Sequence, residues 1–213
     1  MQIRFLFLAS FVALSANIFA QSSKSLVGNS IPDYKFSVST TYLSFLNFGD
    51  EKTNTHHYEF HFKYALTPKD NIGIKFATWS LFRPMGILWW EDALTMDESE
   101  FYPGRLRETG IGVSYQRFLW KGLFSAVEIL PQLKTCLDGN NNKIGNGFKL
   151  YTSYHIGYHI PLFKNRVFLE PQIHCQNWFI DTNTPQAFKE LDKKWHNCFL
   201  FEPNVYIGIY VKN

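Results

Sequence analysis

Polar and aromatic side chains alternate without a break in His57-Tyr58-Glu59-Phe60-His61-Phe62-Lys63-Tyr64. Because successive side chains of a β-strand point to opposite faces, an alternation of period two predicts a strand with one polar and one apolar face. The polar face of this strand carries two histidines, a glutamate and a lysine, whereas the other face carries only aromatic rings. The stretch therefore predicts a strand whose two faces meet very different surroundings.

The same alternation recurs along the chain and is broken by turn residues such as Thr67-Pro68-Lys69-Asp70 and Trp120-Lys121-Gly122. Segments of this kind indicate antiparallel strands joined by turns. We expect eight strands, over residues 35–47, 56–66, 71–82, 105–119, 122–135, 146–161, 165–179 and 199–212. The connections after the second, fourth and sixth strands are short, whereas 83–104 and 181–198 are long.

Short turns at one end and longer loops at the other are the plan of an outer-membrane barrel. Aromatic residues make up 18% of the chain, and a barrel wall uses them both against lipid and in interfacial girdles. The sequence therefore predicts an all-β fold, a closed antiparallel up-and-down transmembrane β-barrel of about eight strands. Because a soluble sandwich also alternates polar and apolar faces, a soluble lipocalin-like or sandwich domain is the alternative.

The first twenty residues have the character of a secretory signal peptide. Arg4 supplies a positive charge, a short apolar run follows, and the small residue Ala20 precedes a polar stretch. This order is typical of an export signal. We expect residues 1–20 to be removed and residues 21–213 to form the barrel domain in the outer membrane of a Gram-negative bacterium.

Charge and hydropathy argue against two other classes of protein. The net charge of +3 is small and no basic stripe is visible, so we expect no nucleic-acid partner. After the signal segment, no stretch approaches 18 consecutive apolar residues, which excludes a helical membrane protein. The three cysteines, Cys136, Cys175 and Cys198, are not well matched in register, and their disulfide status stays open.

Taken together, these features resemble the small outer-membrane barrels of the OmpA, OmpX and OmpW type. The resemblance covers residues 35–212 and rests on the signal segment, the strand number, the turn and loop lengths, and the aromatic-rich strand ends. Residues 206–213 resemble a closing strand, but they end in Asn213 rather than in an aromatic residue. The resemblance implies an eight-stranded membrane barrel and no particular activity.

Polar residues of the inward face are expected to fill the lumen. An eight-stranded barrel has an interior just wide enough for side chains to fill it, and buried charges have to be paired. Acids and lysines nearly balance on this face once Glu108, Lys134 and Lys149 are counted, which favours a plug of paired charges over a pore. The expected lumenal polar cluster consists of His57, Glu59, His61, Lys63, Lys75, Glu128, His155, Glu170, His174 and Glu202.

Metal binding and hydrolysis are two alternatives to a lumen filled with paired charges. His61, His155 and His174 are candidate metal ligands because imidazole binds Zn²⁺ and other transition ions, but no HExxH or paired CxxC motif accompanies them. Ser153 and His155 share a strand face, yet at this spacing they lie about 6.5 to 7 Å apart. We therefore assign no catalytic residue and expect neither a cofactor nor a bound metal.

The two long loops carry apolar residues that a barrel would leave exposed. Trp89 and Trp90 lie in 83–104, and Phe188, Leu191 and Trp195 fall on one face of a short helix in the other loop. Exposed apolar clusters mark partner or membrane contacts. The helix is equally suited to lid the barrel mouth, and the two tryptophans to join the outer aromatic girdle.

The function that we expect is non-enzymatic. The chain would be a structural barrel or an accessory subunit of an envelope complex, in contact with outer-membrane lipids and with a protein partner reached through extracellular loops 83–104 and 181–198. Two alternatives stay open. One is a lipid-modifying outer-membrane enzyme, an acyltransferase or deacylase with its site at the rim, and the other is a barrel that binds a metal through its lumenal histidines.

Overall fold

The computed structural model describes residues 34–48, 53–86 and 98–211. Contacts within the chain divide it into residues 1–30 and residues 31–213, and the described residues all belong to the second part. The expected signal peptide at 1–20 lies outside the described residues, as do Trp89 and Trp90.

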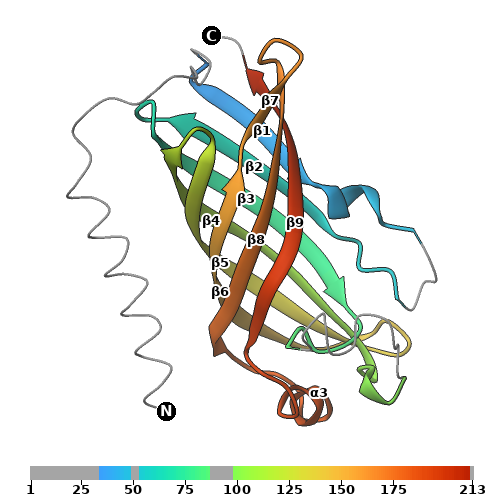
Figure 1. Cartoon of the computed structure of the whole chain (residues 1–213). Helices are drawn as coiled ribbons and strands as arrows, with labels where there is room; N and C mark the ends of the chain where they lie inside the picture. The colour runs from blue at the N-terminus through green and yellow to red at the C-terminus, as the bar shows by residue number, and fades with distance from the viewer. Residues whose placement is uncertain (1–33, 49–52, 87–97, 212–213) are drawn as a thin grey trace, which may run out of the picture. The chain divides into compact units, whose positions relative to one another are not determined.

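The described part of the chain is mostly β-structure (Figure 1). Its connections contain two 3-10 helices, η1 (Tyr42–Phe45) and η2 (Glu98–Glu100), and one α-helix, α3 (Gln186–Asp192). The strands are β1 (Phe36–Thr41), β2 (Tyr58–Ala65), β3 (Asp70–Leu81), β4 (Gly104–Trp120), β5 (Leu123–Asp138), β6 (Lys143–Tyr158), β7 (Ile160–Leu162), β8 (Val167–Asp181) and β9 (Cys198–Val211).

Backbone hydrogen bonds connect these strands into a ring. Each strand from β1 to β5 pairs antiparallel with the next one in the chain, β6 pairs with β8, β8 with β9, and β9 with β1. Eight strands thus form the ring, while the short β7 pairs with β8 beyond the end of β6. The predicted set of eight antiparallel strands is confirmed.

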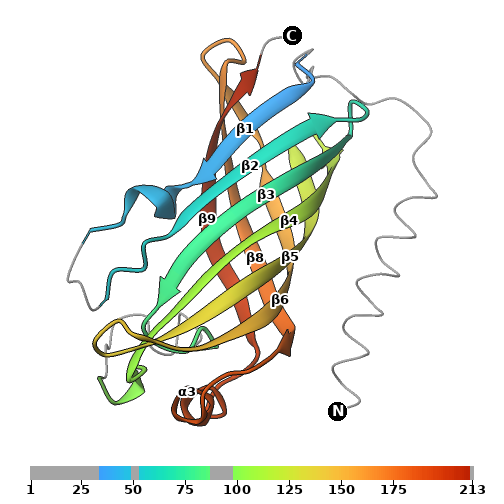
Figure 2. The same ribbon diagram turned by 180° about the vertical axis from the view of Figure 1, so that it is seen from behind.

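The two ends of the ring differ (Figures 1 and 2). The turns β2–β3, β4–β5 and β7–β8 lie at one end, where β1 begins and β9 stops, and we name it the turn end. The opposite end, named the loop end, carries α3, η2 and the β5–β6 connection. Within the described residues, no helix is long and apolar enough to cross a membrane.

Two strand predictions were wrong in detail. The first strand was expected to run to residue 47, but it stops at Thr41, whose hydroxyl accepts a hydrogen bond from the Leu43 amide at 3.3 Å and starts η1. Threonine at this position favours a helix start over a continuing ladder. The sixth strand was expected as one piece, but it is interrupted at His159, whose backbone N–H donates to the Gly122 carbonyl at 2.8 Å.

Candidate functional site

The two faces of the ring differ in chemistry. One residue in two along each strand points outward, and the exposed large apolar side chains include Phe60, Phe62, Ile72, Ile74, Phe76, Ile111, Val113, Ile129, Leu133, Ile156, Ile173, Ile207 and Ile209. The ten residues of the expected lumenal cluster face the other way: eight are buried, whereas the side chains of His57 and Glu202 keep 18% and 30% of their exposure. The interior is therefore polar and charged.

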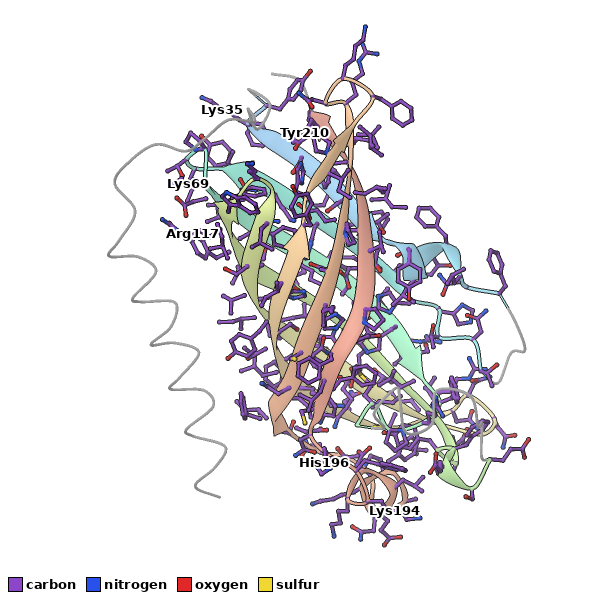
Figure 3. The ribbon with its side chains drawn as sticks, in the orientation of Figure 1. Lys35, Lys69, Arg117, Lys194, His196 and Tyr210 are labelled. Carbon is purple, nitrogen blue, oxygen red and sulfur yellow. The ribbon has the colours of Figure 1, made fainter. Side chains whose placement is uncertain are left out.

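Glu170 organises the charges nearest the turn end. The Lys63 Nζ atom lies 2.8 Å from Glu170 Oε2, and Gln116 donates through Nε2 to Glu170 Oε1 at 3.0 Å. The His159 Nδ1 atom is also 3.0 Å from Oε1, and its Nε2 atom is 2.5 Å from the Tyr210 hydroxyl. Figure 3 shows Tyr210 at this end of the ring. Glu170 thus joins three neighbours in one closed cluster.

Lys75 organises the middle of the interior. Its Nζ atom lies 3.0 Å from Glu59 Oε1 and 2.8 Å from Glu128 Oε2. Glu59 also accepts a hydrogen bond from the Tyr206 hydroxyl. The His61 Nε2 atom lies 3.2 Å from Glu128 Oε1. One lysine is therefore shared by two buried carboxylates that belong to different strands.

The lysine reaches its second carboxylate across β4. Lys75 on β3 is paired in register with Gly112 on β4, so it has to reach across β4 to meet Glu128 on β5. A Cβ atom at Gly112 would lie 2.5 Å from the Ile129 carbonyl oxygen and 3.0 Å from the Leu130 side chain. Glycine at this position allows the close approach of β5 to β4.

Glu108 organises the third cluster, towards the loop end. Its side chain is fully buried and accepts hydrogen bonds from Trp79 Nε1 at 2.8 Å and from the Tyr151 hydroxyl at 2.5 Å. The Lys149 Nζ atom lies 3.0 Å from its Oε1 atom. Lys134 pairs with Asp181 beside it. With this cluster, paired charges extend from the turn end into the loop-end half of the ring.

The partners in these clusters were only partly foreseen. Glu108 was counted on the inward face, but the expected cluster omitted Gln116, His159, Tyr206 and Asp181, which complete the interactions described above. All but Asp181 belong to inward-facing positions of their strands, so the strand alternation was the signal that could have found them. The alternation predicts on which side of the wall a residue lies, but it does not predict which residue it pairs with across the ring.

The candidate metal and catalytic residues do not assemble into either kind of site. The described residues contain no group of three or more His, Cys, Asp or Glu side chains that could hold a metal ion. His155 stacks on His174 with ring centroids 5.2 Å apart, and His61 stacks on Tyr206 at 5.1 Å. The Ser153 hydroxyl donates to Gln176 Oε1 at 3.2 Å and not to a histidine.

Helix α3 packs against the loop end. Phe188 is fully buried and stacks on Tyr102 with ring centroids 4.7 Å apart, and Leu191 packs against the same cluster. The Tyr102 hydroxyl donates to Asp192 Oδ1 at 2.5 Å. The geometry favours a lid over a surface for partner recognition, because the apolar face of the helix already packs within the chain. Trp195, expected on the same helical face, lies after the end of the helix and is half-buried.

The Asp192 carboxyl makes the docking of α3 sensitive to pH. Burial raises the pKa of Asp192 above its ordinary value, and the Tyr102 hydrogen bond opposes this rise. A raised pKa means that ionisation costs the docked state free energy, so docking is favoured at low pH and weakens as the pH rises through the raised pKa. The Asp192→Asn variant keeps an acceptor for Tyr102 without the charge and should lose this dependence.

Amide hydrogen exchange in α3, corrected for intrinsic rates, measures this effect between about pH 4 and 7. Glu190 is exposed on the same helix, so Glu190→Gln is the matched control and should keep the wild-type pH dependence. Equal pH profiles for the wild type and the Asp192→Asn variant would contradict the assignment.

No protein-family model matches the chain, and comparisons with curated proteins and with solved structures find no significant match.

Proposed function

We propose that this chain is an integral outer-membrane protein whose ring of strands spans the membrane as a closed β-barrel. The observation that carries the proposal is the outward face. Ile111 and Val113 of β4 keep 62% and 60% of their exposure, and their outward neighbours on adjacent strands are equally apolar. Soluble monomers rarely expose contiguous apolar patches larger than a few hundred Å², whereas lipid accepts such a face directly.

The height of this apolar belt fits a bilayer. On β4 the outward residues between Arg107 and Arg117 are Thr109, Ile111, Val113 and Tyr115. Ten residues of strand cover about 34 Å, which corresponds to about 25 Å of height at the tilt of membrane barrels. Basic residues mark both ends of the ring, with Lys35, Lys69 and Arg117 at the turn end and Lys194 and His196 at the loop end (Figure 3).

The interior and the loop end support a role without catalysis. Paired charges fill the ring, so it conducts neither ions nor solutes freely, and the Ser153 hydroxyl donates to Gln176 and not to a histidine. We therefore propose a structural barrel or an accessory subunit of an envelope complex. In this orientation the turn end faces the periplasm, and loops 83–104 and 181–198 at the loop end form the extracellular recognition surface.

Refolding of residues 21–213 into lipid vesicles tests the proposal. We expect the protein to float with the vesicles, to run faster on a denaturing gel when unboiled than when boiled, and to leave planar bilayers without stepwise conductance. Protein that stays in solution without lipid and shows no gel shift would contradict the membrane assignment. Discrete conductance steps would contradict the plug while leaving the membrane assignment intact.

A further inference from the structure

The three turns of the turn end share one composition. Each carries a large apolar side chain and, within three residues of it, a lysine; the pairs are Leu66 and Lys69, Trp120 and Lys121, and Phe163 and Lys164. The three apolar side chains keep 53%, 58% and 75% of their exposure, respectively. Because turns favour Gly, Pro, Asn, Asp and Ser, the reversal of the chain does not by itself account for this repeated pair.

The backbone of two of these turns makes the same point. The φ angles of Lys121, Phe163 and Lys164 are 44°, 50° and 57°. Left-handed backbone of this kind favours glycine or asparagine in a short turn, and larger residues adopt it at a conformational cost. Residues held at such a cost concentrate at sites that serve a function. The local conformation therefore does not explain why lysine and phenylalanine stand here.

The turns also carry an excess of positive charge. Their described segments, 64–72, 116–124 and 157–168, contain one acidic residue, Asp70, whose Oδ1 atom lies 2.6 Å from Arg117 Nη1. The basic residues of the same segments are Lys69, Arg117, Lys121, Lys164 and Arg166. Figure 3 shows Lys69 and Arg117 at this end of the ring. One carboxylate that already pairs with Arg117 leaves the turn end positively charged.

The lysines at the loop end have different surroundings. In and just after α3, acids lie among the lysines along the chain, in the order Lys189, Glu190, Asp192, Lys193 and Lys194. Charges of both signs are therefore mixed on this helix, whereas the turns at the opposite end present one sign. Clusters of one sign attract an oppositely charged partner, and mixed charges do so much less.

The level of the turns relative to the apolar belt identifies the kind of partner. Trp120 and Lys121 lie three and four residues beyond Arg117, where the belt ends on β4. That distance corresponds to about 7–10 Å of height at the tilt of a membrane barrel, which is the level of the headgroups beside a hydrocarbon core. The Lys121 Nζ atom lies 4.9 Å from the centre of the Trp120 ring, so both groups meet the same layer.

We propose that the turn end binds the headgroups of anionic phospholipids. The lysines of the three turns lie against the lipid phosphates, and Leu66, Trp120 and Phe163 lie in the interface beside them, where aromatic and basic side chains are both stabilised. A soluble anion could use the lysines but would leave these apolar side chains in water, so a lipid fits both halves of each pair. The inference rests on the proposed membrane location and adds a lipid class and the end of the ring that recognises it.

Amide NMR of the protein in lipid nanodiscs tests this inference. The discs contain phosphatidylcholine with a rising fraction of phosphatidylglycerol, and each sample is first shown to run as the faster unboiled band. We expect the amide signals of Gly122 and Asn165 in the turns to shift and saturate, while that of Gly139 at the loop end stays nearly constant. Saturable shifts with inorganic phosphate in pure phosphatidylcholine discs would overturn the assignment to a lipid. Folded samples without turn-end shifts would overturn this inference alone, whereas failure to obtain the faster band in any disc would contradict the membrane location beneath it.

Two pairs of lysines provide matched variants. Lys121→Gln with Lys164→Gln removes two charges from the turn end, and Lys189→Gln with Lys194→Gln removes two from the loop end; all four side chains are exposed. A basic side chain near an anionic surface contributes about fivefold to binding, so the turn-end variant should need at least about fivefold more phosphatidylglycerol to reach half of the shift. The loop-end variant should keep the wild-type midpoint. A wild-type midpoint in the turn-end variant, or equal increases in both variants, would overturn the proposal.

Discussion

Replacing Lys75 by methionine is expected to lower the free energy of unfolding by about 3–5 kcal/mol, because removal of one partner leaves buried charge uncompensated. Lys75 is the ammonium group between Glu59 and Glu128, at 3.0 and 2.8 Å, and both carboxylates are buried. Methionine fills a similar volume, so the loss reports the charge and not a cavity. Urea titration of the refolded protein, followed by the unboiled gel band, measures it.

The control and the rescue separate charge from packing. Lys35 is exposed (Figure 3), and Lys35→Met should change the stability by less than about 0.5 kcal/mol. The triple variant Glu59→Gln, Lys75→Met, Glu128→Gln removes all three charges together and should recover most of the loss. If Lys75→Met lowered the free energy of unfolding no more than Lys35→Met does, the ion pairs of Lys75 would not contribute to the stability of the ring.

The alternation of side chains predicted the fold well because it reports a physical difference between two surroundings. A strand such as β2 can only expose Phe60 and Phe62 on one side and bury Glu59 and His61 on the other if its register is fixed. The same reasoning placed the inward residues of β3 to β9 on the correct face. Alternation says which side of the wall a residue occupies, and that was sufficient for the ring.

The departures from the prediction have local causes that alternation does not report. Thr41 continues the period-two pattern, yet its hydroxyl starts η1 and ends β1. His159 faces inward as expected, but its backbone N–H bonds to the β4–β5 turn and interrupts the strand. The first interruption arises from a hydrogen bond within the same segment of chain, and the second from a bond to a turn that is distant in the sequence.

The partners of the interior charges were beyond the sequence for a related reason. Lys75 meets Glu128 two strands away, across β4. That contact depends on register and on the curvature of the ring. The near-balance of acids and lysines predicted that the charges would pair, but it did not identify the pairs.

An arginine in the middle of the outward belt is expected to destabilise the protein in lipid vesicles by about 2–4 kcal/mol, because a basic side chain at the midplane of a bilayer loses its hydration. Val113 is the suitable position: it is 60% exposed and lies between Arg107 and Arg117 on β4. Its exposure means that Val113→Arg disturbs no packing within the protein. The unfolding free energy in vesicles of wild type and variant gives the effect.

Leu119 provides the control on the same strand and the same face. It lies beyond Arg117 towards the turn end and is exposed, so Leu119→Arg places an equal charge near the edge of the bilayer. There the cost should fall to about 0–1 kcal/mol. On a surface that met water, both substitutions would stay within about 0.5 kcal/mol of wild type. A large cost at Val113 with a small one at Leu119 is therefore a depth profile that only a membrane around the ring produces, and equal small costs at both positions would contradict the proposed location.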